Sequence, residues 1–95
     1  MQDKNAHYHG EWLEHIETRH GFGQLTRQNG EHYEGFFKDD KFDGKGKLSF
    51  ASNDPKKRRH YLGYFKDGNF HGFGTMTLIN QESYKGFWFK DKLMG

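Results

Sequence analysis

Seven histidines are the residues best suited to chemistry in this chain of 95 residues, and metal binding is the chemistry they would do. His20 and His71 each stand directly before a Gly-x-Gly, so they belong to a recurring pattern rather than to a separate site. His7 and His9 would share one face of a strand, but no third ligand lies nearby in the sequence. Zinc is usually held by His together with Cys or carboxylates, and the chain has no cysteine. We therefore expect no metal site and no cofactor.

The Gly-x-Gly triplets could cradle a phosphate if each followed a strand and opened a helix. They occur at residues 21–23, 44–46 and 72–74, and no helical pattern follows any of them. No serine or threonine sits in a recognisable nucleophile turn, and no acid and base converge near a candidate pocket. We therefore predict that the chain is not an enzyme.

A run of four basic residues is the strongest charge feature, and it consists of Lys56, Lys57, Arg58 and Arg59. The run could simply be a solvated loop. It could also attract acidic lipid headgroups, at about 1 kcal/mol for each basic residue near a membrane surface, and it is similar to a nuclear-localisation patch. Nucleic-acid binding is not expected, because acidic residues are interspersed among the basic ones and the formal net charge is only +2.

These residues sit on a framework that repeats along the chain. An aromatic-x-Gly triplet begins at Tyr8, Tyr33, Tyr61 and Tyr84, and in the first three copies a Gly-x-Gly follows. The lead tyrosines are 25, 28 and 23 residues apart. A period of this length is typical of repeat architectures and argues against a conventional enzyme fold. We assign an N-terminal lead at 1–7, repeats near 8–30, 33–52, 61–80 and (in part) 84–95, and a basic insertion at 53–60.

The composition favours a folded chain with an aromatic core. Aromatic residues make up 18% of the sequence, and ten of them are Phe. Each ring buries a large area, so rings can replace the scarce aliphatic side chains. No apolar stretch is long enough to cross a membrane, and the first residues are polar, so we expect neither a membrane span nor a signal peptide. The expected location is cytoplasmic.

The repeats are predicted to form β-hairpins, because glycines interrupt any helical face and apolar residues alternate. Tyr33 and Phe37 would point to one side of their strand and Phe36 to the other. Turns are expected at 38–41 and 66–69, the second of which contains an Asp-Gly hairpin signal. A tyrosine ring lying across a glycine would explain why these two residue types recur together.

The expected fold is therefore all-β. It is a single-layer antiparallel meander of about seven strands, in which each hairpin contacts only its neighbours.

The pattern Tyr-x-Gly-x-Trp/Phe, Lys-Asp-Gly, His-Gly-x-Gly-x-Leu/Met resembles the MORN (membrane occupation and recognition nexus) repeat. The copy from Tyr61 to Met76 is the most similar, and the resemblance covers nearly the whole chain. The resemblance implies an elongated, curved array of hairpins that acts as a scaffold. It also implies a setting in a cytoskeletal or ciliary assembly.

A single layer leaves its aromatic face uncovered, whereas ordinary domains pack one layer on another. We therefore predict an open groove lined by rings that binds a helix or an extended peptide of a partner protein. The predicted groove residues are Tyr8, Trp12, Tyr33, Phe37, Tyr61, Phe65, Tyr84 and Trp88, with Leu25, Leu48 and Met76 beside them.

A second aromatic stripe is predicted on the opposite, convex face, where it would mark another contact. It consists of Phe22, Phe36, Tyr64, Phe73 and Phe87. An unpaired edge strand could also pair with another chain or mediate self-association. The alternative function is a membrane-associated adaptor that binds acidic phospholipids through Lys56, Lys57, Arg58 and Arg59.

Overall fold

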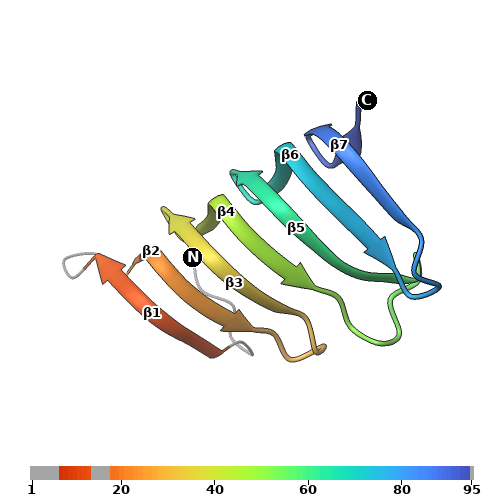
Figure 1. Cartoon of the computed structure of the whole chain (residues 1–95). Helices are drawn as coiled ribbons and strands as arrows, with labels where there is room; N and C mark the ends of the chain where they lie inside the picture. Colours follow the sequence, from red (N-terminus) through yellow and green to blue (C-terminus); the bar gives the residue numbers. More distant parts are fainter. Residues whose placement is uncertain (1–6, 14–17, 95) are drawn as a thin grey trace.

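The strands form one open antiparallel sheet in which each strand pairs with the next along the chain (Figure 1). The computed structural model describes residues 7–13 and 18–94. The predicted N-terminal lead, except for His7, and the turn between the first two strands lie outside the described residues. The strands are β1 (His7–Leu13), β2 (Thr18–Thr26), β3 (His32–Lys38), β4 (Lys41–Ser49), β5 (Arg58–Lys66), β6 (Asn69–Leu78), β7 (Ser83–Phe89) and β8 (Lys92–Leu93).

The predicted all-β hairpin meander is confirmed. About seven strands were expected, and the eighth is the two-residue strand β8, which pairs with β7 only through Trp88 and Phe89. The described part of the chain contains strands, turns and bends but no helix. Accordingly, none of its elements is a long apolar helix of the kind that crosses a membrane.

Two-residue turns join β3 to β4 and β5 to β6. Both turn residues have positive φ angles in each case: 52° and 69° at Asp39 and Asp40, and 52° and 86° at Asp67 and Gly68. Paired positive φ angles define the type I′ turn, whose twist matches that of the flanking strands. The turns predicted at 38–41 and 66–69 are therefore confirmed, and a further turn of the same kind joins β7 to β8.

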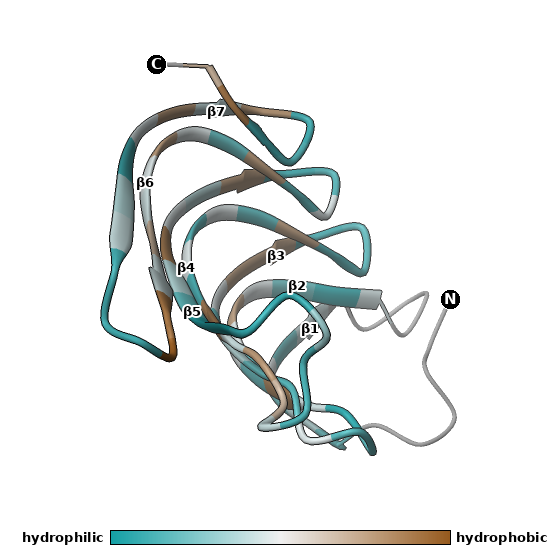
Figure 2. Cartoon of the chain, turned by 90° about the vertical axis from the view of Figure 1, so that its right-hand side faces the viewer, coloured by the Kyte–Doolittle hydropathy of each residue, from teal (hydrophilic) through white to brown (hydrophobic). Residues whose placement is uncertain are grey.

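The strands bend sharply, so the sheet forms a trough with a concave and a convex face (Figure 2). Residues alternate between the two faces: Tyr33 and Phe37 are buried, whereas Glu34 and Phe36 between them are exposed. Register irregularities interrupt the pairing of β3 with β4 between Gly35 and Phe37, and such bulges increase bending. The same break recurs in the first and third hairpins.

Glycine pairs make room for the tyrosines in the concave core. Gly35 and Gly46 stand opposite each other in β3 and β4. A methyl group added at Gly35 would lie 2.7 Å from the Tyr33 hydroxyl, closer than real atoms approach. Tyr61 lies over Gly63 and Gly74 in the same way. The expectation that a tyrosine ring lies across a glycine is therefore confirmed.

Candidate interaction surfaces

The concave face is filled by the protein's own aromatic rings. The Tyr33 ring stacks on Phe42, with centroids 3.8 Å apart, and the Tyr61 ring stacks on Phe70 at 4.2 Å. A single layer was expected to leave its aromatic face uncovered; the bend of the strands instead buries the central rings against one another, while rings near the two ends stay exposed. Phe42 and Phe70 were not among the predicted residues, although both stand two residues before a Gly-x-Gly.

The residues predicted to line an open groove therefore divide into two groups. Five of them are no more than 8% exposed and belong to the core: Tyr33, Phe37, Tyr61, Phe65 and Trp88. Tyr8 is partly buried, whereas Trp12 and Tyr84 are 41% and 45% exposed near the two ends of the array. The predicted flanking residues Leu25, Leu48 and Met76 are buried as well.

Hydrogen bonds fix the buried tyrosines. The Tyr33 hydroxyl donates to the carbonyl oxygen of Phe36 at 2.8 Å, and the Tyr61 hydroxyl donates to that of Tyr64 at 3.1 Å. Burial raises the pKa of Tyr61 to about 12 and raises the pKa of Tyr33 as well. Both phenols therefore stay protonated at ordinary pH and serve the packing.

Arg19 takes the place of a ring in the first repeat. It stands two residues before a Gly-x-Gly, as Phe42 and Phe70 do, and it is only 5% exposed. Its guanidinium lies 5.9 Å from the centroid of the Tyr8 ring and 5.7 Å from that of Phe37. A cation placed over a ring face is attracted by the ring's quadrupole.

Asp40 holds Arg19 in this position. Its carboxylate accepts hydrogen bonds from the Arg19 backbone N–H at 2.7 Å and from Nε at 3.0 Å. Burial alone would raise the pKa of Asp40, but the hydrogen bonds and the charge of Arg19 outweigh it and lower the pKa to about 2. The ion pair therefore persists over most of the pH range.

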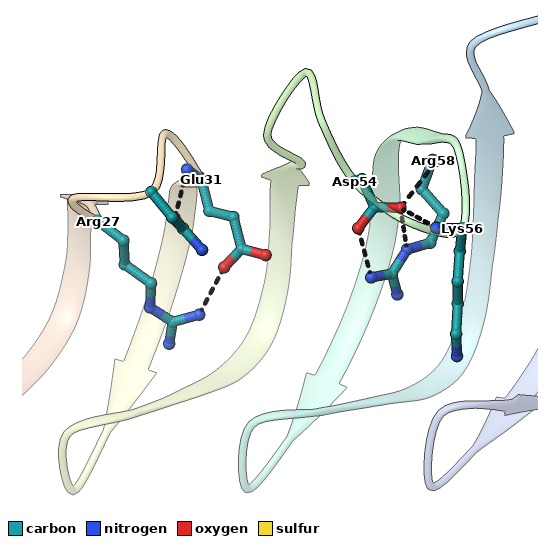
Figure 3. Close-up of polar contacts among 6 residues, drawn as sticks. Arg27, Glu31, Asp54, Lys56 and Arg58 are labelled. Atoms are coloured by element: carbon teal, nitrogen blue, oxygen red, sulfur yellow. Dashed lines mark hydrogen bonds and ion pairs between the residues drawn. The ribbon is translucent and has the colours of Figure 1, made fainter.

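Two more arginines cover the concave core (Figure 3). Arg27 lies over the Phe42 ring, 5.2 Å from its centroid, and pairs with Glu31 at 2.9 Å. Arg58 lies 3.9 Å from the centroid of Phe50 and pairs with Asp54 at 2.8 Å. Each of these guanidinium groups thus lies over a ring of the concave side and is held by a carboxylate.

The same contacts divide the basic run that was predicted to bind lipids. The hydrogen bond from Arg58 is the main reason why the pKa of Asp54 falls to about 2. The Asp54 carboxylate also accepts the backbone N–H of Lys56 at 3.1 Å. Arg58 therefore organises its own loop, which leaves Lys56, Lys57 and Arg59 exposed.

A hollow of about 460 Å³ remains on the concave side above the covered core. Its apolar floor includes Phe42, Leu48 and Phe70, which are themselves at most 8% exposed. Charged side chains of both signs surround that floor, including Lys41, Lys56 and Asp91. This hollow is thus more polar than the ring-lined groove that was predicted.

The convex face carries a row of exposed rings, which we call the convex row. It consists of Phe22, Phe36, Tyr64, Phe73 and Phe87, whose exposed fractions lie between 44% and 59%. These are the residues of the predicted second stripe.

The pairing of the strands aligns the convex row across the sheet. Phe22 stands opposite Phe36, and Phe73 stands opposite Phe87, with ring centroids 5.5 and 4.8 Å apart. Tyr64 stands opposite Lys45, the one residue that interrupts the row between β2 and β7. Sequence alternation predicted the shared face, and the register adds the direct pairing of Phe22 with Phe36 and of Phe73 with Phe87.

The structure brings no metal-binding cluster together among residues 7–13 and 18–94. His20 and His71 occupy equivalent positions in β2 and β6. The Nδ1 atom of His20 is buried without a hydrogen-bond partner, but among the described residues no set of acidic or further histidine ligands surrounds it.

The fold and its surfaces define a repeat protein built from a single sheet of β-hairpins, with a ring-filled concave side and an exposed aromatic convex side. The MORN repeat family model matches residues 18–32, 33–54 and 61–82, and the chain belongs to this family. Repeats of this family generally serve as non-catalytic modules for protein or membrane interaction. No curated protein matches the sequence.

Proposed function

We propose that this protein is a non-catalytic interaction module that docks a partner protein on its convex row. The observation that carries this proposal is the difference in exposure between the two aromatic faces. Rings of the convex row are about half exposed, whereas the central rings of the concave face are almost fully buried. An aligned row of exposed rings is costly to leave in water and usually marks an interaction site.

The size of the row suits a protein contact. An aromatic side chain offers roughly 200 Å² of surface, so five half-exposed rings present on the order of 500 Å². A standard protein interface buries about 800 Å² on each partner. The convex row therefore supplies most of the apolar centre of such an interface, and its polar surroundings supply the rim.

The groove remains a second place at which a peptide could bind, but its chemistry differs from the prediction. A ligand there would meet the paired arginines and the exposed Lys41 and Lys56 before it met any ring. The lipid-binding alternative loses one of its four cations to the Arg58–Asp54 pair. The cytoskeletal or ciliary setting rests on the family resemblance and stays a prediction.

Proximity labelling in cells separates the two faces. One variant replaces three rings of the convex row with serine (Phe36→Ser, Tyr64→Ser and Phe73→Ser). A matched variant removes two cations from the concave hollow (Lys41→Ser and Lys56→Ser). Both must first match the wild-type circular dichroism spectrum. We expect a defined set of labelled proteins to disappear with the first variant and to persist with the second, and the opposite result would assign binding to the concave side.

A further inference from the structure

A recess interrupts the convex row near its centre. It has a volume of about 230 Å³ and lies over the backbone of Gly35 and Gly46, between the outward side chains of their neighbours. Phe22 and Phe36 line it together with Leu62, which is itself 49% exposed. A Cβ at either glycine would point to the opposite, concave side, where the Tyr33 ring lies.

Two lysines line the same recess. Lys45 stands opposite Tyr64, and Lys47 stands opposite Leu62, on neighbouring positions of one face. The equivalent of Lys45 is a phenylalanine in the first and third repeats, so a cation replaces a ring only here. Both lysines are exposed, and neither forms an ion pair with a carboxylate in the part of the chain that the structure describes.

The one carboxylate of the recess is turned to another partner. Glu34 stands opposite Lys47 in the sheet, but its Oε2 atom accepts a hydrogen bond from Gln24 at 3.5 Å. The recess therefore combines apolar walls with two lysines and one glutamate, and none of the three forms an ion pair with another described residue. Three further lysines lie on the same convex face by strand alternation: Lys38, Lys66 and Lys85.

We propose that this recess receives an apolar side chain from an acidic partner segment, whose carboxylates pair with Lys45 and Lys47. The inference rests on the proposed function of the convex row and specifies the chemistry of its partner. An apolar side chain would bury its surface against Phe22, Phe36 and Leu62. Adjacent aspartates or glutamates would meet the two ammonium groups and set the orientation of the segment.

The shape of the site favours a peptide over a membrane. A recess accepts a side chain that projects from a partner, whereas a lipid surface meets mainly the residues that project from the protein. The exposed lysines are also placed inside the ring row rather than on a separate basic patch. A peptide can contact both groups at once, because acidic and apolar side chains alternate over similar distances along an extended segment.

The test uses a displayed library of short random peptides, selected on the immobilised wild-type chain. Enriched peptides are sequenced, synthesised with a fluorescent label and titrated by anisotropy. Lys45→Met with Lys47→Met removes the charge but keeps most of the aliphatic stem, so the cover that each stem gives to the rings is retained. Lys38→Met with Lys85→Met is the matched control, because it makes the same charge change on the same face away from the recess.

We expect enriched peptides to combine acidic residues with an aromatic or aliphatic residue. Their affinity should fall about tenfold in the Lys45/Lys47 variant, as expected for the loss of two charge contacts, and should change little in the control. Enrichment of neutral or basic peptides, or equal binding by both lysine variants, would overturn the inference while leaving the convex row in place. A parallel selection is made on the immobilised Phe36→Ser, Tyr64→Ser, Phe73→Ser variant. If no peptide is enriched more strongly on the wild-type chain than on this variant, the inference is overturned as well.

Two further results would show that the convex row and its recess do not bind an acidic peptide. If the selected peptides still bind that triple-serine variant, the proposed function and the inference both fail, because the rings take no part. Vesicles of phosphatidylcholine with and without phosphatidylserine form the second arm. Binding only to the phosphatidylserine vesicles, lost in the Lys45/Lys47 variant, would make the recess part of a lipid-binding face and overturn the peptide proposal.

Discussion

One position of the repeat accepts either a ring or a guanidinium. Phe42 and Phe70 stack on tyrosines there, and Arg19 lies over Tyr8 and Phe37 instead. Arginine needs a carboxylate where phenylalanine needs none, because a buried cation without a partner is strongly unfavourable. For Arg19 that carboxylate is Asp40 in the β3–β4 turn, whereas the equivalent turn positions beside Phe42 and Phe70 are Gly68 and Asp91.

This difference predicts how paired substitutions will behave. Asp40→Gly should lower the free energy of unfolding by about 3 kcal/mol, because Arg19 loses its main carboxylate. Adding Arg19→Phe should recover most of that loss, because the pair then has the same residues as Phe42 and Gly68 at the equivalent positions one repeat further along the chain. Urea denaturation of the two single variants and the double variant measures the coupling. Additive effects would show that Arg19 and Asp40 contribute independently.

The two low carboxyl pKa values predict acid sensitivity. Asp40 and Asp54 both have folded pKa values of about 2, below the ordinary value of 3.8. Each therefore adds stability at pH values above about 4, and this contribution is lost as the pH falls from about 4 to about 2. We expect a loss of about 2 kcal/mol per carboxylate over that window. Asp54→Asn should be less stable at neutral pH and should lose less on acidification, and an unchanged pH profile would contradict this assignment.

At the scale of the hairpin, stability depends on the glycines that leave room for a tyrosine ring against the paired strands. Gly46→Ala would place a methyl group against the Tyr33 ring, so we expect it to cost about 3 kcal/mol of unfolding free energy. Gly68→Ala is the comparison, because nothing lies within 4 Å of the added methyl group and only its positive φ of 86° is unfavourable. It should cost about 1 kcal/mol. Equal losses would mean that backbone strain, rather than contact with the ring, sets the cost.

The sequence predicted the hairpins well because their signals are local. Alternation assigned Tyr33 and Phe36 to opposite faces, and the Asp67-Gly68 pair marked its turn. Closure of the groove was not predicted, because it depends on the bend of the strands and on rings from different strands. Phe42 and Phe70 recur at the same place in their repeats, and this recurrence could have predicted that both are core residues. Arg19 fills the same place in the first repeat, but its burial becomes understandable only from its contact with Asp40 in the structure.

At the scale of the whole molecule, the array has two edges and no second layer. The described residues extend 42 × 26 × 16 Å, and each strand pairs only with its sequence neighbours, although rings of alternate strands also touch, as Tyr33 and Phe65 do. Strand β1 is paired on one side only, and most of β7 lacks a partner on the side of β8. That these edges pair with another chain, or with a second copy of this one, stays a prediction.

Hydrogen exchange should reveal this arrangement. Amides of β4 and β5 are flanked by strands on both sides, so they should exchange through the global unfolding reaction. Amides of β1 and β7 should exchange faster, because the ends of a linear array open first. Protection of β7 that rises with protein concentration would be the sign of edge pairing. Uniform protection along the chain at low concentration would contradict independent opening of the ends.

The alternation of the strands also makes the convex face a regular lattice. Outward positions lie about 4.8 Å apart between strands and about 6.8 Å apart along each strand. The rings that hold the sheet together all lie on the other side, so an outward side chain can change without disturbing the interior. Charged and aromatic residues at outward positions could therefore be substituted one at a time, in evolution or by design, while the supporting sheet stays the same.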